Sequence, residues 1–200
     1  MNPLELTFEP VTAEHWYEFE ALLGGGQECQ GCYCMWLRAD DQETFRARIG
    51  EGNRDAMRAL IEAGTVPGLL ALANGLPVGW VAVGPREDFP ALDQFAEFAT
   101  TDRPDGPLWV CPCFYIHVGY RNRGVMTSLI GAAVAFAREH GAAAIEAFPV
   151  EPDAPVIPDG DAFGGFLSAF LAAGFVVIGR NPETYAQHSV GLRPVVRYTF

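Results

Sequence analysis

The sequence predicts an α/β fold in which helices cover both faces of a mixed β-sheet. An apolar run over 108–118, a helical pattern over 123–140 and a second apolar run over 143–150 follow one another. A strand, helix, strand order of this kind makes a right-handed parallel crossover. Asn74-Gly75 separates two earlier apolar runs and is typical of an antiparallel hairpin. Parallel and antiparallel neighbours therefore occur in one sheet.

Apolar patterning gives a sheet of about seven strands and defines where each strand lies. The expected strands are 4–11, 68–73, 78–84, 108–118, 143–150, 175–179 and 193–200. Pro112 lies within the fourth of them and has no N–H for the sheet, so we expect a bulge or an unpaired edge there. Strand alternation places Cys111, Cys113, Tyr115 and His117 on one face, unless that bulge shifts Cys111.

The helices are delimited by caps and glycines. Thr12 can cap the first helix, and Gly24 stops it. Gly50 and Gly64 close the next two helices, and Gly141 closes the longest one. The expected helices are 13–23, 41–50, 53–63, 90–98, 123–140 and 162–173.

Length and composition indicate a single domain over residues 1–200. The formal net charge of −12 disfavours nucleic acid and anionic membranes as partners and suits cationic substrates such as amines. We found no apolar stretch of membrane-spanning length and no signal-peptide pattern, so we expect a cytoplasmic protein. Five cysteines are an odd number, which argues against a disulfide framework.

The junction between the strand over 108–118 and the long helix carries the strongest functional signal. Gly124 allows a tight turn into a helix whose first N–H groups have no partner and attract anions. Arg121 and Arg123 lie at this helix start, where a cation is unfavourable unless an anion binds nearby. The spacing matches neither a dinucleotide-binding glycine motif nor a P-loop.

The run Arg121-Asn122-Arg123-Gly124-Val125-Met126 resembles motif A of the GNAT acyltransferases. The resemblance implies a GNAT-like fold, with an acetyl-CoA-binding core at about 68–180. It also implies that backbone amides of this turn bind the coenzyme A pyrophosphate, and that the strand before it binds the pantetheine arm. The implied coenzyme-binding residues are Ile116, Val118, Arg121, Asn122, Arg123, Gly124, Val125, Met126 and Thr127.

Three further stretches, 77–83, 170–175 and 31–36, are similar to segments of the same family or of a bacterial subset of it. Two positions depart from the family pattern. Met126 replaces a small residue, but its backbone N–H remains and its flexible side chain can point away. Phe170 replaces a tyrosine that often protonates the leaving thiolate, and a thiolate leaves without such help.

The resemblance implies an N-acetyltransferase that uses acetyl-CoA as co-substrate and a small amine as acceptor, with direct transfer in a ternary complex. Direct attack needs an uncharged amine, so a base is expected. The candidates for the catalytic base are His117, whose unperturbed pKa is near ~6.5, and Glu146, a carboxylate inside an apolar strand. A packed histidine and a paired carboxylate are the structural alternatives for these two residues.

Two other functions stay open at this stage. The first is a non-catalytic module that binds an acyl-CoA, and the second is a thiolate metal protein using Cys29, Cys32 and Cys34 with the second cysteine pair, Cys111 and Cys113. Thiols two residues apart on one strand face are separated by about seven ångströms, which suits a single metal poorly. We therefore expect no metal. Met35 and Trp36 are expected to line a pocket or the core, and a homodimer is left open.

Overall fold

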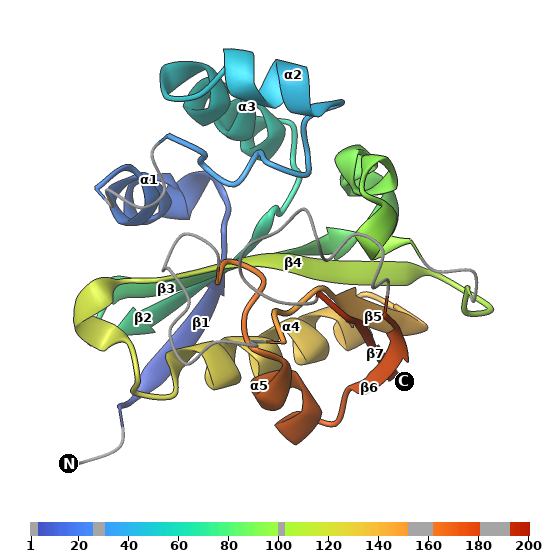
Figure 1. Ribbon diagram of the computed structural model, residues 1–200. Coiled ribbons are helices and arrows are strands. Elements are labelled where there is room, and N and C mark those ends of the chain that lie inside the picture. Colours follow the sequence, from blue (N-terminus) through green and yellow to red (C-terminus); the bar gives the residue numbers. More distant parts are fainter. Residues whose placement is uncertain (1–3, 26–30, 100–102, 152–161, 181–192) are drawn as a thin grey trace.

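The computed structural model describes residues 4–25, 31–99, 103–151, 162–180 and 193–200. Within these ranges a seven-stranded mixed sheet forms the centre of the molecule, in the order β1-β2-β3-β4-β5-β7-β6 (Figure 1). β4 and β5 are parallel, and every other neighbouring pair is antiparallel. The predicted fold class is confirmed. The strands are β1 (Leu6–Pro10), β2 (Gly68–Ala73), β3 (Leu76–Pro85), β4 (Leu108–Ile116), β5 (Ala144–Ala147), β6 (Val176–Gly179) and β7 (Val195–Thr199).

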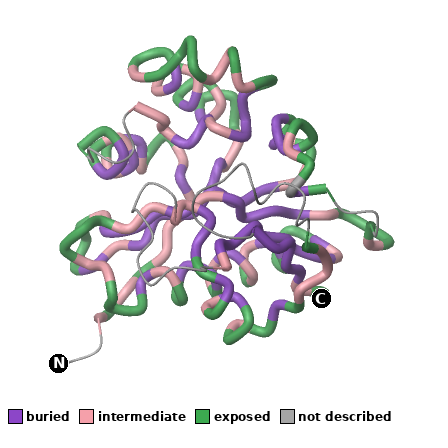
Figure 2. Tube along the Cα trace, viewed as in Figure 1, coloured by how far each residue is buried: buried purple, intermediate pink, exposed green. Residues whose placement is uncertain are grey.

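Helices lie on both faces of this sheet, as predicted (Figure 1). One apolar cluster joins the sheet to α4 and α5, and a second cluster joins the opposite face to α1 and α3. Figure 2 shows buried residues concentrated along the sheet and exposed ones on the outer helices. The helices are α1 (Trp16–Gly24), α2 (Gln42–Ala47), α3 (Glu51–Glu62), α4 (Val125–Glu139) and α5 (Leu167–Ala172), with short 3₁₀ turns η1 (Ala13–His15), η2 (Arg86–Asp88), η3 (Pro90–Gln94), η4 (Ala96–Phe98) and η5 (Val118–Tyr120).

In the first half of the chain, local sequence signals predicted the start of the first helix and the β2–β3 hairpin correctly. The Thr12 hydroxyl accepts a hydrogen bond from the Glu14 N–H and starts the first helical segment. Asn74 and Gly75 both have positive φ angles, 51° and 77°, as a two-residue hairpin turn between β2 and β3 requires. The hairpin prediction is therefore confirmed.

Two predicted elements in the second half are twice as long as those in the structure. The strand expected over 143–150 ends at Ala147, and the helix expected over 162–173 begins at Leu167. Val150 instead forms an isolated parallel bridge with Phe166. The helix over 90–98 was also predicted wrongly, since the structure has the two 3₁₀ turns η3 and η4 there.

A bulge at Pro112 divides β4 into two parts that face differently. Ala82 of β3 pairs with Cys113, whereas Gly84 pairs with Val110, so two β4 residues stand opposite one residue of β3. Cys111 packs in the core on the α4 side, whereas Cys113 and Tyr115 pack on the α1 side. The bulge and the displacement of Cys111 are as the sequence predicts.

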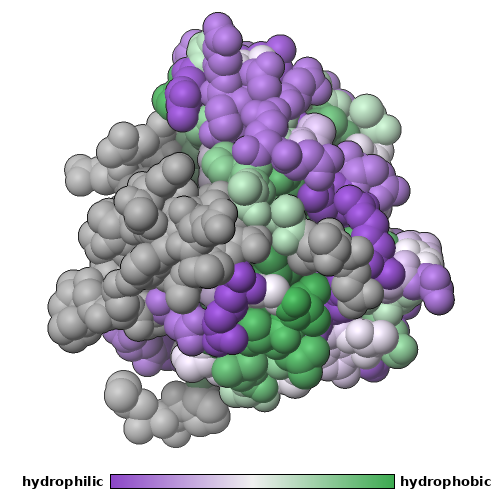
Figure 3. All heavy atoms as spheres, turned by 45° about the vertical axis from the view of Figure 1, so that its right-hand side comes forward, coloured by the Kyte–Doolittle hydropathy of each residue, from purple (hydrophilic) through white to green (hydrophobic). Residues whose placement is uncertain are grey.

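The outer surface is hydrophilic over α2 and α3, which form the upper part of the molecule in Figure 3. Exposed large apolar side chains include Leu171 of α5 and Val176 of β6. Across the described ranges, every helix is too short or too polar to span a bilayer.

Gly68 tests how tightly the sheet is packed under α1. A Cβ atom at this position would meet the Val81 carbonyl oxygen and would lie 2.6 Å from the buried Trp80 ring. We expect Gly68→Ala to lower the free energy of unfolding by about 1–3 kcal/mol, as overpacking does. Urea denaturation followed by circular dichroism measures this change.

Gly131 is the matched control, because it lies in the exposed part of α4 and a Cβ there has no neighbour within 4 Å. Gly131→Ala should raise the free energy of unfolding by about 0.5–1 kcal/mol, since alanine favours a helix over glycine. Equal unfolding midpoints for the two variants would contradict this description of the packing.

Candidate active site

The site begins where β4 and β5 separate. β4 pairs with β5 over Leu108–Val110 alone among the described residues, and the rest of β4 extends past the end of this pairing. The Phe114 N–H donates instead to the Phe163 carbonyl at 2.6 Å. The C-terminal half of β4 therefore has one edge along which a ligand can lie.

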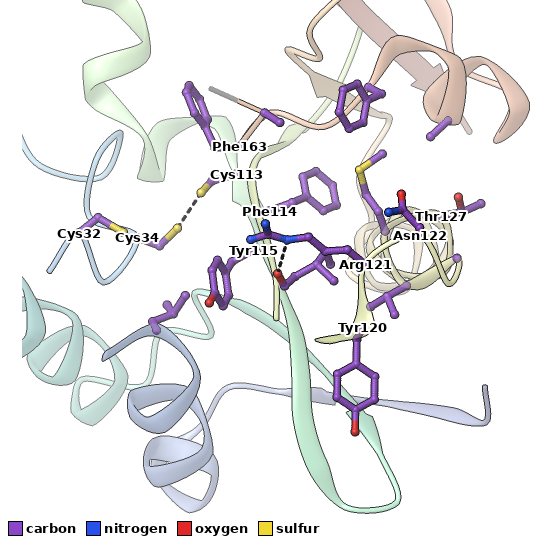
Figure 4. A pocket seen from close by; sticks show the side chains of 18 of the residues that line it. Cys32, Cys34, Cys113, Phe114, Tyr115, Tyr120, Arg121, Asn122, Thr127 and Phe163 are labelled. Carbon is purple, nitrogen blue, oxygen red and sulfur yellow. Dashed lines mark hydrogen bonds between the residues drawn. The ribbon is translucent and has the colours of Figure 1, made fainter. Parts of the chain in front are cut away.

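A cavity of about 640 Å³ opens beside this half of β4. It extends from the start of α4 to the segment that follows α1, and Figure 4 shows side chains of both regions turned toward it. Its walls are Leu23, Cys32, Cys34, Trp36, Phe45, Cys113, Phe114, Tyr115, Ile116, Tyr120, Arg121, Asn122, Gly124, Val125, Met126, Thr127, Ala162, Phe163, Phe166, Ser168 and Ala169.

The α4 end of the cavity has the geometry of an anion site. Gly124 is the N-cap of this 15-residue helix with φ 81°, and it provides no side-chain cap. The first intrahelical backbone bond that it accepts comes from the Ser128 N–H. The N–H groups of Val125, Met126 and Thr127 are thus first-turn donors beside the cavity, where the helix dipole favours negative charge.

The predicted coenzyme residues are only partly brought together. Seven of the nine line the cavity: Ile116, Arg121, Asn122, Gly124, Val125, Met126 and Thr127. Val118 is 65% exposed, and Arg123 stacks its guanidinium over the Tyr120 ring at 5.3 Å. Neither of these two is part of the cavity wall. Their assignment rests on the motif alone.

Ile116 is the last residue of β4, whereas Val118 begins the 3₁₀ turn η5, so only Ile116 keeps the strand geometry beside the cavity. The His117 N–H donates to the Val78 carbonyl of β3, so the backbone polar groups of Ile116 point to the opposite edge of β4. The Ile116 carbonyl accepts a hydrogen bond from Arg121 Nε at 3.1 Å on that edge (Figure 4).

Neither candidate base lines the cavity. His117 follows the end of β4, is exposed, and accepts a hydrogen bond from the Gly119 N–H through Nδ1. Glu146 lies buried in β5, where Arg197 Nη2 and Nε donate to its Oε1 at 2.6 and 2.9 Å. Burial raises the pKa of Glu146, and the hydrogen bonds from Arg197 oppose that rise.

The opposite end of the cavity is aromatic and contains thiols. Trp36 packs edge-on against Phe163 at 4.4 Å, and its ring N–H donates to Gln42 Oε1. Cys34 Sγ lies 2.9 Å from Cys113 Sγ (Figure 4). Trp36 lines the cavity and Met35 lies in the core, so the expectation for this pair is confirmed.

Sequence reasoning missed most of the aromatic end. Phe45 and Phe163 of this end were not predicted as site residues, and neither was Tyr120 in the turn before α4, although all three line the cavity. Once the position of the bulge is known, it determines on which face of the sheet Cys113 lies. The sequence does not single out a contact between Cys113 and Cys34. Phe170 is fully buried and packs edge-on against Phe114, away from the cavity wall. Among the residues that the structure describes, no group of three histidine, cysteine or acidic side chains is arranged to hold a metal ion.

A mixed sheet whose central strands separate beside a helix N-terminus is the arrangement expected from the resemblance to the GNAT acyltransferases. The family model for the acetyltransferase (GNAT) family matches residues 27–158, which is more than half of the chain. The chain therefore belongs to the GNAT family of acetyltransferases. No curated protein matches it by sequence.

Solved structures agree with this fold. A GNAT-family acetyltransferase from Streptococcus pneumoniae has a TM-score of 0.57 at 14% identity, covering 98% of this chain and 100% of that one. PaiA N-acetyltransferase from Thermoplasma acidophilum, in complex with coenzyme A, has a TM-score of 0.54 at 11% identity with the same coverage. A variant of agmatine N-acetyltransferase in its apo form has a TM-score of 0.60 at 10% identity, again covering 98% and 100%.

The Glu146–Arg197 pair is expected to act in stability. Both side chains are buried, with 2% and 7% of their surface exposed, so Glu146→Gln removes a carboxylate from a buried guanidinium. We expect a loss of about 3 kcal/mol in the free energy of unfolding, which chemical denaturation measures.

The control for this prediction is the double variant Glu146→Gln/Arg197→Met, which removes both charges and should recover part of that loss. If Glu146→Gln left the free energy of unfolding unchanged but strongly reduced acetyl transfer, Glu146 would be the base and not a structural partner of Arg197.

Proposed function

We propose that the protein transfers the acetyl group of acetyl-CoA to the amine of a small molecule by direct attack in a ternary complex. The observation that carries this proposal is one continuous cavity that joins the first-turn N–H groups of α4 to an aromatic wall. Two reactants that occupy the two ends of one cavity can react without a covalent enzyme intermediate. Membership of the GNAT family supports the use of acetyl-CoA.

The coenzyme would bind along the open edge of β4. Its pyrophosphate would accept hydrogen bonds from the first-turn N–H groups of α4, which need no reorganisation to meet an anion. Arg121 lies half-buried next to this turn and is placed to add a positive charge. The pantetheine arm would then run past Ile116 and Phe114 toward Cys113, carrying the thioester to the middle of the cavity.

The acceptor end favours an amine on an apolar or aromatic body. Trp36, Phe45 and Phe163 supply ring faces and edges, and Leu23 adds an aliphatic surface. A low-polarity wall also disfavours the protonated amine, so binding itself lowers the pKa of the acceptor amine. The amine would therefore reach the thioester in its reactive, uncharged form.

Two explanations for the deprotonation of the acceptor amine can be distinguished. In the first, substrate binding draws His117 to the cavity, where it accepts the proton as the predicted base. In the second, desolvation of the amine is sufficient and no base is needed. His117→Ala should then cost on the order of 10²–10⁴ in rate at neutral pH in the first case and little in the second. In the first case the loss should also shrink as pH approaches the pKa of the amine.

Gly124 tests the coenzyme end. A Cβ at this residue has no neighbour within 4 Å, so a valine side chain would occupy space beside the first turn of α4 and strain a φ of 81°. Gly124→Val should weaken acetyl-CoA binding at least about tenfold, or 1.4 kcal/mol, in isothermal titration.

Gly64→Val is the matched control for strain, because Gly64 has φ 92°, no neighbour within 4 Å and no place in the cavity wall. It should lose stability to a similar extent and keep its affinity for acetyl-CoA. If the Gly124→Val and Gly64→Val proteins bound acetyl-CoA with equal affinity, the coenzyme would not bind at this turn.

Trp36 tests the acceptor end. A panel of aliphatic, aromatic and polycationic amines is screened for release of the coenzyme thiol, and we expect the aromatic amines to be acetylated fastest. With the best amine, Trp36→Ala should raise KM about tenfold or more, because one large apolar contact is worth roughly 1.5–3 kcal/mol.

The same variant should bind acetyl-CoA normally, and Trp36→Phe should keep most of the acceptor affinity. If no amine releases thiol while acetyl-CoA still binds, the protein is the non-catalytic acyl-CoA-binding module instead. If the KM for the amine were unchanged in Trp36→Ala, the acceptor would bind in another part of the cavity.

A further inference from the structure

Three thiols gather at the acceptor end of the cavity without an assigned role. Cys34 and Cys113 are 79 positions apart in the sequence, yet Cys34 Sγ donates to Cys113 Sγ at 2.9 Å. Cys32 also lies within hydrogen-bond reach of Cys34, and all three residues line the cavity. Figure 4 shows Cys34 and Cys113 turned toward each other from opposite segments.

The local backbone brings these sulfurs together from both sides. Tyr33 and Cys34 adopt positive φ angles of 34° and 49°, and the Met35 N–H closes the turn on the Cys32 carbonyl. On the other strand, the bulge at Pro112 turns Cys113 to the α1 side of the sheet. Non-glycine residues with positive φ are strained, and such strain is typically kept where the position has a task.

The two sulfurs differ in how exposed they are. Cys34 is buried, and its pKa is raised well above the ordinary value by hydrogen bonds with Cys113 and Cys32 and by burial. Cys113 is half-buried and faces the cavity, so of these two sulfurs Cys113 is the more accessible to an oxidant that enters the cavity. Cys34 is then the second thiol, which lies next to the oxidised sulfur.

Cys111 provides a built-in comparison. It is fully buried on the α4 side of β4, and burial alone raises its pKa. It lies outside the cavity wall and has no role in the thiol cluster.

We propose that Cys34 and Cys113 form a reversible disulfide that ties the segment after α1 to β4 in the wall of the cavity. A hydroperoxide is the class of oxidant. The Cys113 thiolate attacks one peroxide oxygen to give a sulfenic acid and releases the alcohol or water; the Cys34 thiol then displaces the sulfenic hydroxyl as water. Two thiols and one hydroperoxide thus give one disulfide, one alcohol (or water) and one water.

The geometry needs little adjustment for this bond. A disulfide requires a sulfur separation of about 2.05 Å, so the pair has to approach by less than about 1 Å. The bond would close a long loop across the sheet, and long loops gain the most from cross-linking in the unfolded state. It would also fix the wall that carries Trp36, two residues from Cys34.

The test uses the intact chain and does not depend on acetyl transfer. The reduced protein is treated with hydrogen peroxide, its remaining thiols are blocked with an alkylating reagent, and the unreduced digest is analysed by mass spectrometry. We expect a cross-linked peptide pair containing Cys34 and Cys113 that dithiothreitol releases. The melting temperature of the oxidised protein should rise by about 5 °C or more and return on reduction.

Variants separate this pair from the other cysteines. Cys113→Ser should abolish both the cross-link and the rise in melting temperature, whereas Cys111→Ser and Cys32→Ser should keep both. Cys34→Ser, if the variant folds, should also abolish both the cross-link and the rise in melting temperature. The proposal is overturned if oxidation links Cys32 instead, if it stops at sulfinic acid on Cys113, or if the purified protein carries one zinc per chain that protects these thiols.

Discussion

Among the described residues, β4 pairs with β5 only as far as Val110, while on its other side it keeps β3 along most of its length. Pro112 lies just beyond this point and provides no N–H to either neighbour, so the chain absorbs the mismatch as a bulge. Two consequences follow from this one break. The open edge of β4 becomes available to a ligand, and the side chains beyond the bulge exchange faces, which sends Cys113 and Tyr115 to the α1 side. Without the bulge, the cavity wall at this point would present different residues.

The break also explains why the two ends of the cavity have different origins. The α4 end is built mainly from one continuous stretch, in which strand, turn and helix follow each other within residues 114–127. The aromatic end collects Leu23, Trp36, Phe45 and Phe163 from segments far apart in the sequence. The proposed anion binding therefore depends on local backbone geometry, whereas the proposed acceptor binding depends on how the helices before β2 and the segment before α5 pack against the sheet.

This difference sets how much the sequence could predict. Asn74-Gly75, Thr12 and Pro112 act through their own backbone preferences, so the hairpin, the first helix start and the bulge were predicted correctly. The turn at Gly124 is local too, and most of its residues line the cavity. Elements that depend on distant partners were predicted poorly. β5 ends at Ala147 because the chain leaves the sheet to bridge with Phe166, a contact that no periodicity reveals.

Charged residues inside apolar strands illustrate the same limit. The sequence marks Glu146 as either paired or functional, and only the register of β5 with β7 brings Arg197 opposite to it. Arg38 is a similar case: its buried guanidinium lies 3.4 Å from Asp88 and stacks over the Phe89 ring, although the sequence does not mark it as paired. Both pairs hold segments from different parts of the chain together. Glu146 and Arg38 lie outside the cavity wall, whereas Arg121 is half-buried next to the first turn of α4 and is part of that wall.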